Sequence, residues 1–171
     1  MAEERDLGPL VHISAEALGQ PGQRRFRLRA MNDRSESAVL WLEKEQLIAL
    51  GEAIETVLKG EGYNYQRLPL DDREPEAVLP LDAFVEMRLA QLSMGLNREK
   101  RCIVLIAGDS QDPDAHDAAT VMMEFDYRRG YELRGQISAV VAAGRPPCPL
   151  CTGPMDPEGH VCVKTNGHHP H

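Results

Sequence analysis

The chain lacks any apolar run long enough to cross a membrane. Nothing in its 171 residues approaches the roughly 18 consecutive apolar residues that a membrane-spanning helix needs. The first ten residues, MAEERDLGPL, have neither the basic start nor the apolar core of a secretory signal. We therefore expect a cytoplasmic protein that makes no membrane contact.

The chain also has fewer basic than acidic residues. Lys and Arg total 19 against 27 Asp and Glu, which gives a formal net charge of -8 at pH 7. An acidic chain gains no general electrostatic attraction to phosphate backbones, so the composition disfavours nucleic-acid binding. Hydrophobic residues make up 42% and charged residues 27%, which is typical of a folded globular domain.

The first half of the chain predicts two strands and a helix. Residues 25–30 alternate arginine with apolar side chains, which indicates a half-buried strand, and residues 37–42 predict a second strand after a turn. From Glu43 the apolar residues follow helical spacing, with Gly60 placed to cap the helix. Residues 1–22, rich in Gly and Pro, are predicted to be irregular. Trp41 is interpreted as a core residue.

The second half repeats this order with an additional strand. Residues 85–96 alternate, but the apolar phase flips near residues 89–91, which indicates a bulge or bend. Residues 102–107 predict a central strand, residues 121–125 a last strand, and residues 127–143 a helix. The sequence therefore predicts an α+β fold. We expect a mostly antiparallel sheet of about five strands with two helices on one face.

Two segments of the chain resemble each other at an offset of 83 residues. Apolar positions in strand 37–42 and in the following helix match those in strand 121–125 and the helix after it. Many strand–helix units can be aligned in this way. The pattern is therefore compatible both with an internal ββα-type duplication and with coincidence.

Cysteine is scarce and concentrated near the C-terminus. Of the four cysteines, Cys102 lies in an apolar run and is predicted to be a small buried side chain. The other three, Cys148, Cys151 and Cys162, lie close together without a signal peptide, which favours a metal site over disulfides. A pair of cysteines two residues apart, followed by His160 and Cys162, is a ligand pattern of structural Zn²⁺.

The predicted ligands of a structural zinc ion are therefore Cys148, Cys151, His160 and Cys162. His160 and Cys162 are two residues apart, so in an extended segment both side chains point the same way. His168 is the alternative fourth ligand, and the sequence leaves the choice between His160 and His168 open.

These features divide the chain into two parts. We expect an α+β domain over residues 1–144 and a zinc-ribbon-like tail over residues 145–171. Such a short tail has almost no apolar core, so the metal would supply most of its folding free energy.

The tail also carries a family resemblance. Residues 143–151 (AGRPPCPLC) and 154–162 (PMDPEGHVC), then 166–168, resemble the bacterial family catalogued as domain of unknown function 3090. The resemblance extends to residues 19–26 and 42–46. The family usually has Gly after the second cysteine and Pro-Arg after the last, where this chain has Thr152 and Val163-Lys164. The resemblance implies a zinc-tailed bacterial protein of uncharacterised function.

Two features outside the tail have chemical potential. The loop at 108–117 holds four carboxylates and His116, which would suit a divalent cation or acid–base chemistry, although it lacks an EF-hand pattern. Arg25, Arg27 and Arg29 share one strand face and would suit a phosphorylated or acidic ligand. A solvated loop and the solvent side of an outer strand are the simpler interpretations.

We expect a non-catalytic zinc-containing binding or adaptor protein with a protein partner. The first alternative is an enzyme of small-molecule or phosphoryl chemistry that uses the basic strand face and the acidic 108–117 loop. The second is a nucleic-acid binder that acts through the ribbon, which the acidic composition disfavours. The sequence does not fix the oligomeric state, and a homo-oligomer is compatible with it.

Overall fold

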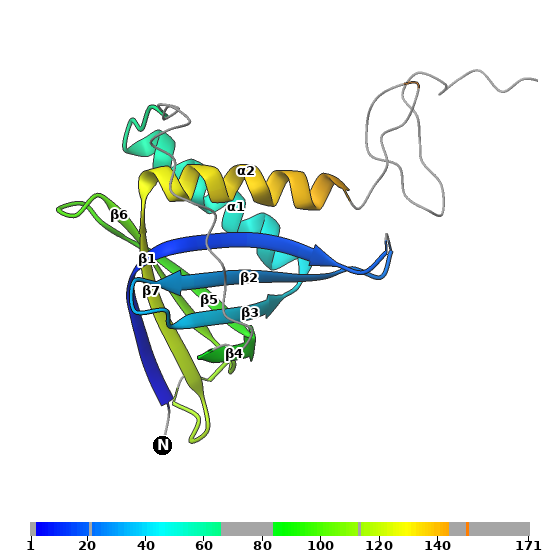
Figure 1. Ribbon diagram of the computed structural model, residues 1–171, viewed down its shortest axis with the longest axis vertical. Helices are drawn as coiled ribbons and strands as arrows, with labels where there is room; N and C mark the ends of the chain where they lie inside the picture. Colours follow the sequence, from blue (N-terminus) through cyan, green and yellow to red (C-terminus); the bar gives the residue numbers. More distant parts are fainter. Residues whose placement is uncertain (1–2, 21, 66–83, 113, 144–149, 151–171) are drawn as a thin grey trace, which may run out of the picture.

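The computed structural model describes residues 3–20, 22–65, 84–112 and 114–143, together with Leu150 (Figure 1). Within these residues the chain forms seven strands and two helices. In chain order they are β1 (Glu3–Leu18), β2 (Arg25–Asn32), β3 (Ser37–Leu42), α1 (Lys44–Gly60), β4 (Val85–Arg88), β5 (Gln91–Asn97), β6 (Cys102–Gly108), β7 (Ala119–Asp126) and α2 (Tyr127–Ala143).

The strands form one mixed sheet in the order β4-β3-β2-β1-β7-β6-β5. Neighbours pair antiparallel except for β3 with β4 and β1 with β7, which pair parallel. The α+β class is confirmed, but the expectation of a mostly antiparallel sheet of about five strands is wrong. Two strands account for the difference. β1 was not expected, and residues 85–96, which were expected to form one strand, are divided between β4 and β5.

Strand β1 was missed because its side chains do not alternate regularly. Residues 1–22 were expected to be irregular, yet β1 is 16 residues long. Gly8 has a φ of +63°, a conformation that glycine adopts readily. The pairing register shifts beside Gly8 on the β7 side and after Leu10 on the β2 side. These shifts change the face on which side chains lie, so the buried residues lose the period of two. The buried residues are Leu7, Leu10, Ile13 and Ala15.

The phase flip near residues 89–91 marks the end of one strand and the start of another. β4 pairs with β3, whereas β5 pairs with β6 at the opposite margin of the sheet. Leu89 N–H donates to the Trp41 carbonyl and Ala90 N–H donates to the Gly108 carbonyl. Two consecutive residues therefore bridge from one half of the sheet to the other. The irregularity was placed correctly, but a bulge within one strand was the wrong interpretation.

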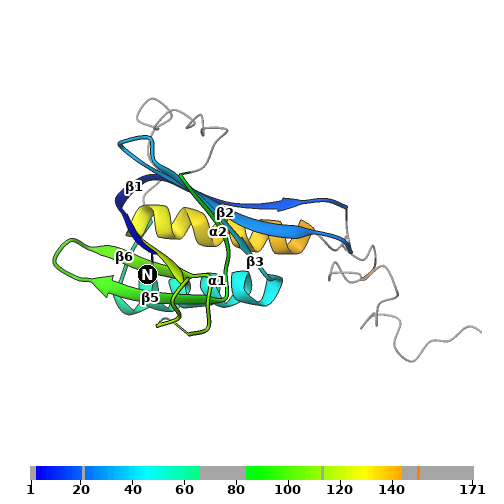
Figure 2. The same ribbon diagram turned by 90° about the horizontal axis from the view of Figure 1, so that it is seen from below.

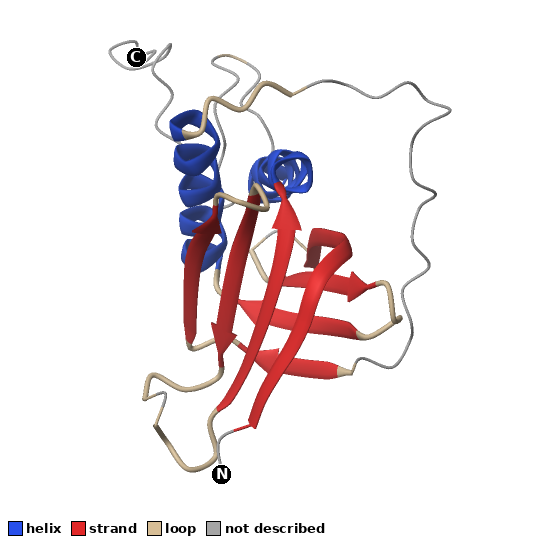
Figure 3. Ribbon diagram, turned by 90° about the vertical axis from the view of Figure 1, so that its left-hand side faces the viewer, coloured by secondary structure: helices blue, strands red, loops and turns tan. Residues whose placement is uncertain are grey.

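The two halves of the molecule have the same topology. In each half three antiparallel strands lead into a helix of 17 residues. A parallel fourth strand lies beside the third: β4 in one half and residues 3–9 of β1 in the other. α2 begins at Tyr127, 83 residues after α1 begins at Lys44. The sequence offset thus relates two equivalent units, whose strands run in different directions in Figure 3.

The helices pack against each other and share one hydrophobic core with the sheet. The first half contributes the buried face of β2 and β3, for example Leu28 and Leu40, and the second half contributes Ile103 and Phe125. Ile54 of α1 also lies in this core. At the end of α1, Gly62 rather than Gly60 takes the left-handed conformation, with a φ of +64°. The expectation that Gly60 caps the helix is therefore wrong by two residues.

Candidate functional site

The three arginines of β2 lie on the outer face of the sheet. Phe26, Leu28 and Ala30 alternate with them and are buried, so period-two geometry turns Arg25, Arg27 and Arg29 away from the core. The half-buried strand expected at residues 25–30 is confirmed, and the arginines share one face as expected. Their neighbours on β1, β3 and β4 decide what that face offers to a ligand.

Trp41 of β3 lies beside the arginines on the same face. The register pairs Arg27 with Trp41. The guanidinium carbon of Arg25 is 4.1 Å from the centre of the indole ring, and that of Arg27 is 5.4 Å away. The indole Nε1 donates a 3.0 Å hydrogen bond to Oε1 of Glu86 on β4. Trp41 is therefore not the core residue that its apolar surroundings suggested. Its alternation with the buried Leu40 and Leu42 was the signal for the outer face.

A carboxylate on β1, that of Glu16, partly balances the charges of Arg27 and Arg29. Glu16 Oε2 accepts a 2.8 Å hydrogen bond from Nε of Arg27, and Oε1 lies 3.4 Å from Nη1 of Arg29. These side chains are only about a quarter to a third exposed. The charges of Arg27 and Arg29 are thus partly balanced within the fold, and Arg25 is the exposed arginine of the row.

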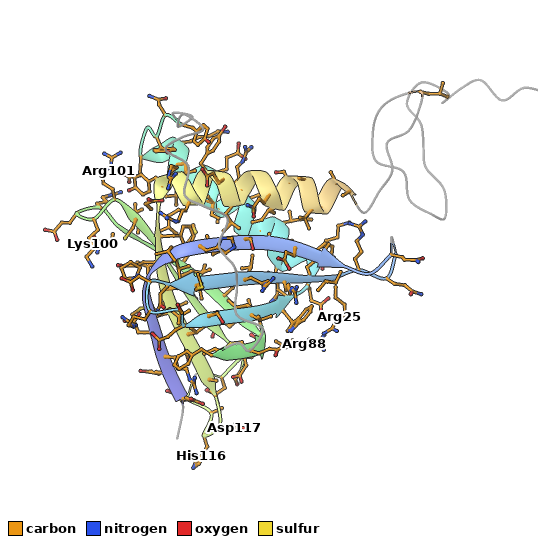
Figure 4. All side chains as sticks on the ribbon, in the orientation of Figure 1. Arg25, Arg88, Lys100, Arg101, His116 and Asp117 are labelled. Atoms are coloured by element: carbon orange, nitrogen blue, oxygen red, sulfur yellow. The ribbon has the colours of Figure 1, made fainter. Side chains whose placement is uncertain are left out.

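Arg88 extends the same face towards the margin of the sheet. The register places Arg88 beside Trp41, and its side chain is 81% exposed. Its Nη2 lies 2.8 Å from Oε1 of Glu43, which is also exposed. Figure 4 shows Arg25 and Arg88 near one another at one side of the molecule. We call Arg25, Trp41, Glu86 and Arg88 the tryptophan cluster. It presents an indole that is hydrogen-bonded to Glu86, with the exposed guanidinium group of Arg25 over the ring and the exposed Arg88 on the adjacent strand.

The acidic loop uses its carboxylates to shape its own backbone. Asp109 Oδ1 accepts a 2.7 Å hydrogen bond from the Ala119 N–H, and Asp112 Oδ1 accepts a 3.0 Å bond from the Asp114 N–H. The Asp112–Asp114 contact is turn chemistry, whereas the Asp109–Ala119 contact joins the two ends of the loop. Across the described residues, no three His, Cys, Asp or Glu side chains gather as a metal site. The solvated-loop interpretation therefore accounts for the described contacts of residues 108–117.

The structure does not bring the basic row and the acidic loop together. Arg25 lies far from His116 and Asp117 in Figure 4. A shallow cleft of about 210 Å³ does lie beside the loop, lined by Asp109, Thr120, Arg5 and Phe84 among others, but by none of the β2 arginines. Arg5 already donates a 2.7 Å hydrogen bond to the Phe84 carbonyl and lies over the Phe84 ring. In the described part of the chain, the β2 arginines and the acidic loop therefore do not form the joint enzyme site that the first alternative requires.

Cys102 is buried, as expected, and is poorly suited to nucleophilic chemistry. Its side chain is 7% exposed, and its Sγ lies 3.7 Å from Oε2 of Glu124. Burial, and then the negative charge of Glu124, raise the pKa of the Cys102 thiol. A thiol with a raised pKa holds little thiolate at neutral pH, and the thiolate is the reactive form.

Comparison with protein families gives one result. The family model described as "Protein of unknown function (DUF3090)" matches residues 6–162. The chain belongs to this family. No curated protein and no solved structure matches it.

The DUF3090 match covers the sheet and both helices, and it continues through the C-terminal tail as far as Cys162. It therefore includes Cys148, Cys151 and His160 and leaves out His168. Cys162 and these four residues, which are the predicted zinc ligands and the alternative ligand, all lie outside the described residues.

Neither helix of the described part is long and apolar enough to span a membrane.

Proposed function

We propose that this DUF3090 protein is a non-catalytic binding protein whose tail holds a structural zinc ion. The observation that carries the zinc assignment is the spacing Cys148-x-x-Cys151 and His160-x-Cys162. Two thiolates from one tight turn and two ligands from a returning segment complete the tetrahedron that Zn²⁺ prefers. Four protein ligands leave no open position for a substrate, so the metal would be structural.

His160 is the proposed fourth ligand, in preference to His168. The family match ends at Cys162 and so takes in His160 only, which supports a ligand set shared across the family. The two-residue spacing from Cys162 also favours His160 in an extended segment.

Zinc content separates these two candidates. His160→Ala should purify with far less zinc than the wild type, because removing one of four ligands opens the site. His168→Ala, the matched control in the same tail, should keep about one Zn²⁺ per chain. Zinc lost from His168→Ala and retained by His160→Ala would reverse the assignment.

The tryptophan cluster is the proposed binding surface of the folded domain. Trp and Arg are enriched where protein partners make their strongest contacts, because they combine a large apolar area with hydrogen-bond donors. Here the indole is held by Glu86 and flanked by Arg25, so little ordering is needed on binding. Exposed Arg25 and Arg88 favour a protein segment that carries acidic side chains.

The single tryptophan of the chain provides a direct test. Titration with an acidic peptide library should change Trp41 fluorescence for the peptides that bind. Arg25→Glu should abolish that change by reversing the charge over the ring. Arg34→Glu is the control, because Arg34 is 61% exposed in the turn after β2 and makes its ion pair with Glu36, outside the cluster. Equal binding by Arg25→Glu and wild type would exclude this surface.

The role of the tail is tested separately. A chain ending at residue 144 should keep the fluorescence response if the tryptophan cluster alone binds the partner. If the response is lost, the tail forms part of the binding surface. Pull-down with mass spectrometry, comparing the full chain with this truncated chain and with Arg25→Glu, would identify the partner.

A further inference from the structure

Strand β5 is one margin of the sheet in the described part of the chain. Among the described strands it pairs only with β6 (Figure 2). Its seven residues, Gln-Leu-Ser-Met-Gly-Leu-Asn, include no charge and no proline, although 27% of the whole chain is charged. Edge strands of soluble proteins are commonly protected by charge, by proline or by short length. The opposite margin, β4, is protected in this way, with four residues that include Glu86 and Arg88.

The side chains of β5 are symmetric about Met94. Residues equally distant from Met94 on either side have the same chemical character: leucines, small residues, or amides. The matched pairs are Leu92 with Leu96, Ser93 with Gly95, and Gln91 with Asn97. Two copies of one strand that pair antiparallel across a two-fold axis place each residue opposite its matched residue. β5 thus has the self-complementary pattern that such a pair requires.

We infer that the protein forms a two-fold symmetric homodimer in which β5 of one copy pairs antiparallel with β5 of the other about Met94. Main-chain hydrogen bonds along the two open edges hold the copies together and join two seven-stranded sheets. The apolar residues Leu92, Met94 and Leu96 are only partly buried in the single chain, and they gain cover from their counterparts. This inference does not rest on the zinc site or on the tryptophan cluster.

Charge at the two ends of β5 favours the same arrangement. The net charge of -8 opposes general self-association, so a contact between copies needs local complementarity. The turn after β5 holds Arg98, Lys100 and Arg101 together with Glu99, all exposed, so it is basic on balance. Arg98 and Lys100 form ion pairs with Glu61 and Glu124 of the same chain, and Arg101 has no such pair among the described residues. At the other end, the Ala90 carbonyl accepts a hydrogen bond from Gln111 of the acidic loop.

Antiparallel pairing brings these opposite ends together. In Figure 4, Lys100 and Arg101 lie at one end of the sheet, and His116 and Asp117 lie at the other. Pairing about Met94 places the basic turn of one copy beside the start of β5 and the acidic loop of its partner. The two-fold axis makes this favourable contact twice.

A pair of seven-residue strands is a small interface, so we expect a weak dimer with a dissociation constant on the order of 10 µM. Sedimentation equilibrium of the full chain from about 5 to about 500 µM should show the mass rising from 19.0 kDa towards twice that value.

Two matched variants test the register of the pair. Residues 93 and 95 are exposed, and a Cβ at Gly95 would meet nothing within 4 Å, so both positions accept long side chains. In the inferred dimer residue 93 faces residue 95 of the other copy. The double variant S93K/G95K therefore places lysine opposite lysine and should raise the dissociation constant at least about tenfold. S93K/G95E places lysine opposite glutamate and should dimerise at least as well as the wild type.

Circular dichroism and thermal melting of both variants establish that they are folded. A wild-type chain that stays monomeric at about 500 µM would overturn the inference. So would dimerisation of S93K/G95K equal to that of the wild type, because the contact would then lie elsewhere. Failure of S93K/G95E to dimerise better than S93K/G95K would overturn the antiparallel register.

Discussion

Gly51 of α1 packs directly against Ile137 of α2. A Cβ at residue 51 would lie 3.1 Å from Cγ2 of Ile137, closer than ordinary van der Waals contact. Ile137 is 3% exposed, and a β-branched side chain in a helix has little freedom to move aside. The absence of a side chain at residue 51 therefore sets how closely the two helices approach.

Alanine at Gly51 should destabilise the protein even though alanine is the better helix former. The clash with Ile137 should outweigh a gain in helix propensity of about 1 kcal/mol, so Gly51→Ala should lower the free energy of unfolding by about 1 kcal/mol. Gly135→Ala is the control, because a Cβ there meets nothing within 4 Å. It should raise the free energy of unfolding by about 0.5 to 1 kcal/mol in urea denaturation. Equal stabilisation by both variants would show that the helices are not in close contact.

The sequence predicted those elements whose side chains follow one period without interruption. β2 and β3 alternate cleanly, and α1 and α2 keep helical spacing, so all four were placed to within a few residues. β1 was not predicted because Gly8 and the register shifts interrupt the alternation of apolar and polar side chains that is typical of a strand. Parallel pairing of β3 with β4 depends on contacts between distant segments, which periodicity does not report.

Some parts of the candidate site could be predicted from the sequence and others could not. Arg25, Arg27 and Arg29 were recognised from spacing alone. The partial balancing of Arg27 and Arg29 by Glu16 depends on the β1–β2 register, and β1 was not predicted. Trp41 was assigned to the core because it stands in an apolar strand, at a spacing typical of packed residues. Its position between two buried leucines implied the opposite face.

Two aspartate substitutions, one on each face of α1, test which face of the helix is buried. Ile54 is fully buried, so Ile54→Asp places a charge in the core and should cost more than about 4 kcal/mol, enough to unfold a typical domain. Ala49→Asp puts the same charge on the exposed face of the same helix and should change stability by less than about 1 kcal/mol. Circular dichroism melting curves report both. A cooperative melt of Ile54→Asp like that of the wild type would contradict the assigned helix face.

Tyrosine ionisation should weaken the fold in alkali. Tyr127 is 3% exposed, and burial raises the pKa of its phenol above the ordinary value of 10.0. The unfolded chain therefore loses this proton at lower pH than the folded chain. Stability is fully present below about pH 10 and falls as the pH rises above it. Burial raises the pKa of Tyr63 in the same direction, and its ring packs edge-on against Tyr127.

Tyr127→Phe should reduce this alkaline loss. The Tyr127 hydroxyl has no hydrogen-bond partner among the described residues, so at pH 7 the variant should match the wild type within about 0.5 kcal/mol. Above pH 10 its free energy of unfolding should fall less steeply, by up to about 1.4 kcal/mol per pH unit. Urea denaturation at several pH values measures the slope. Identical slopes for both proteins would mean that Tyr127 ionises equally in the folded and unfolded chains.

Cys102 should take no part in metal binding. It lies in β6 within the folded core, and the proposed zinc ligands all lie in the C-terminal tail. Cys102→Ala should therefore retain about one Zn²⁺ per chain, the stoichiometry of a four-ligand site. Metal analysis of the purified variant provides the measurement. Loss of the zinc would make Cys102 a ligand and would invalidate the division into domain and tail.

Zinc content combined with the stability of the domain tests the central claim most directly. The wild-type protein, purified under reducing conditions with zinc present, should contain about one Zn²⁺ per chain, and Cys148→Ser should contain almost none. Hydrogen exchange with and without a chelator should then show faster exchange only from about residue 145 onward, because the domain has its own core, whereas the proposed zinc ion would supply most of the folding free energy of so short a tail. Absence of zinc from the wild-type protein, or melting of the whole domain on chelation, would contradict the account.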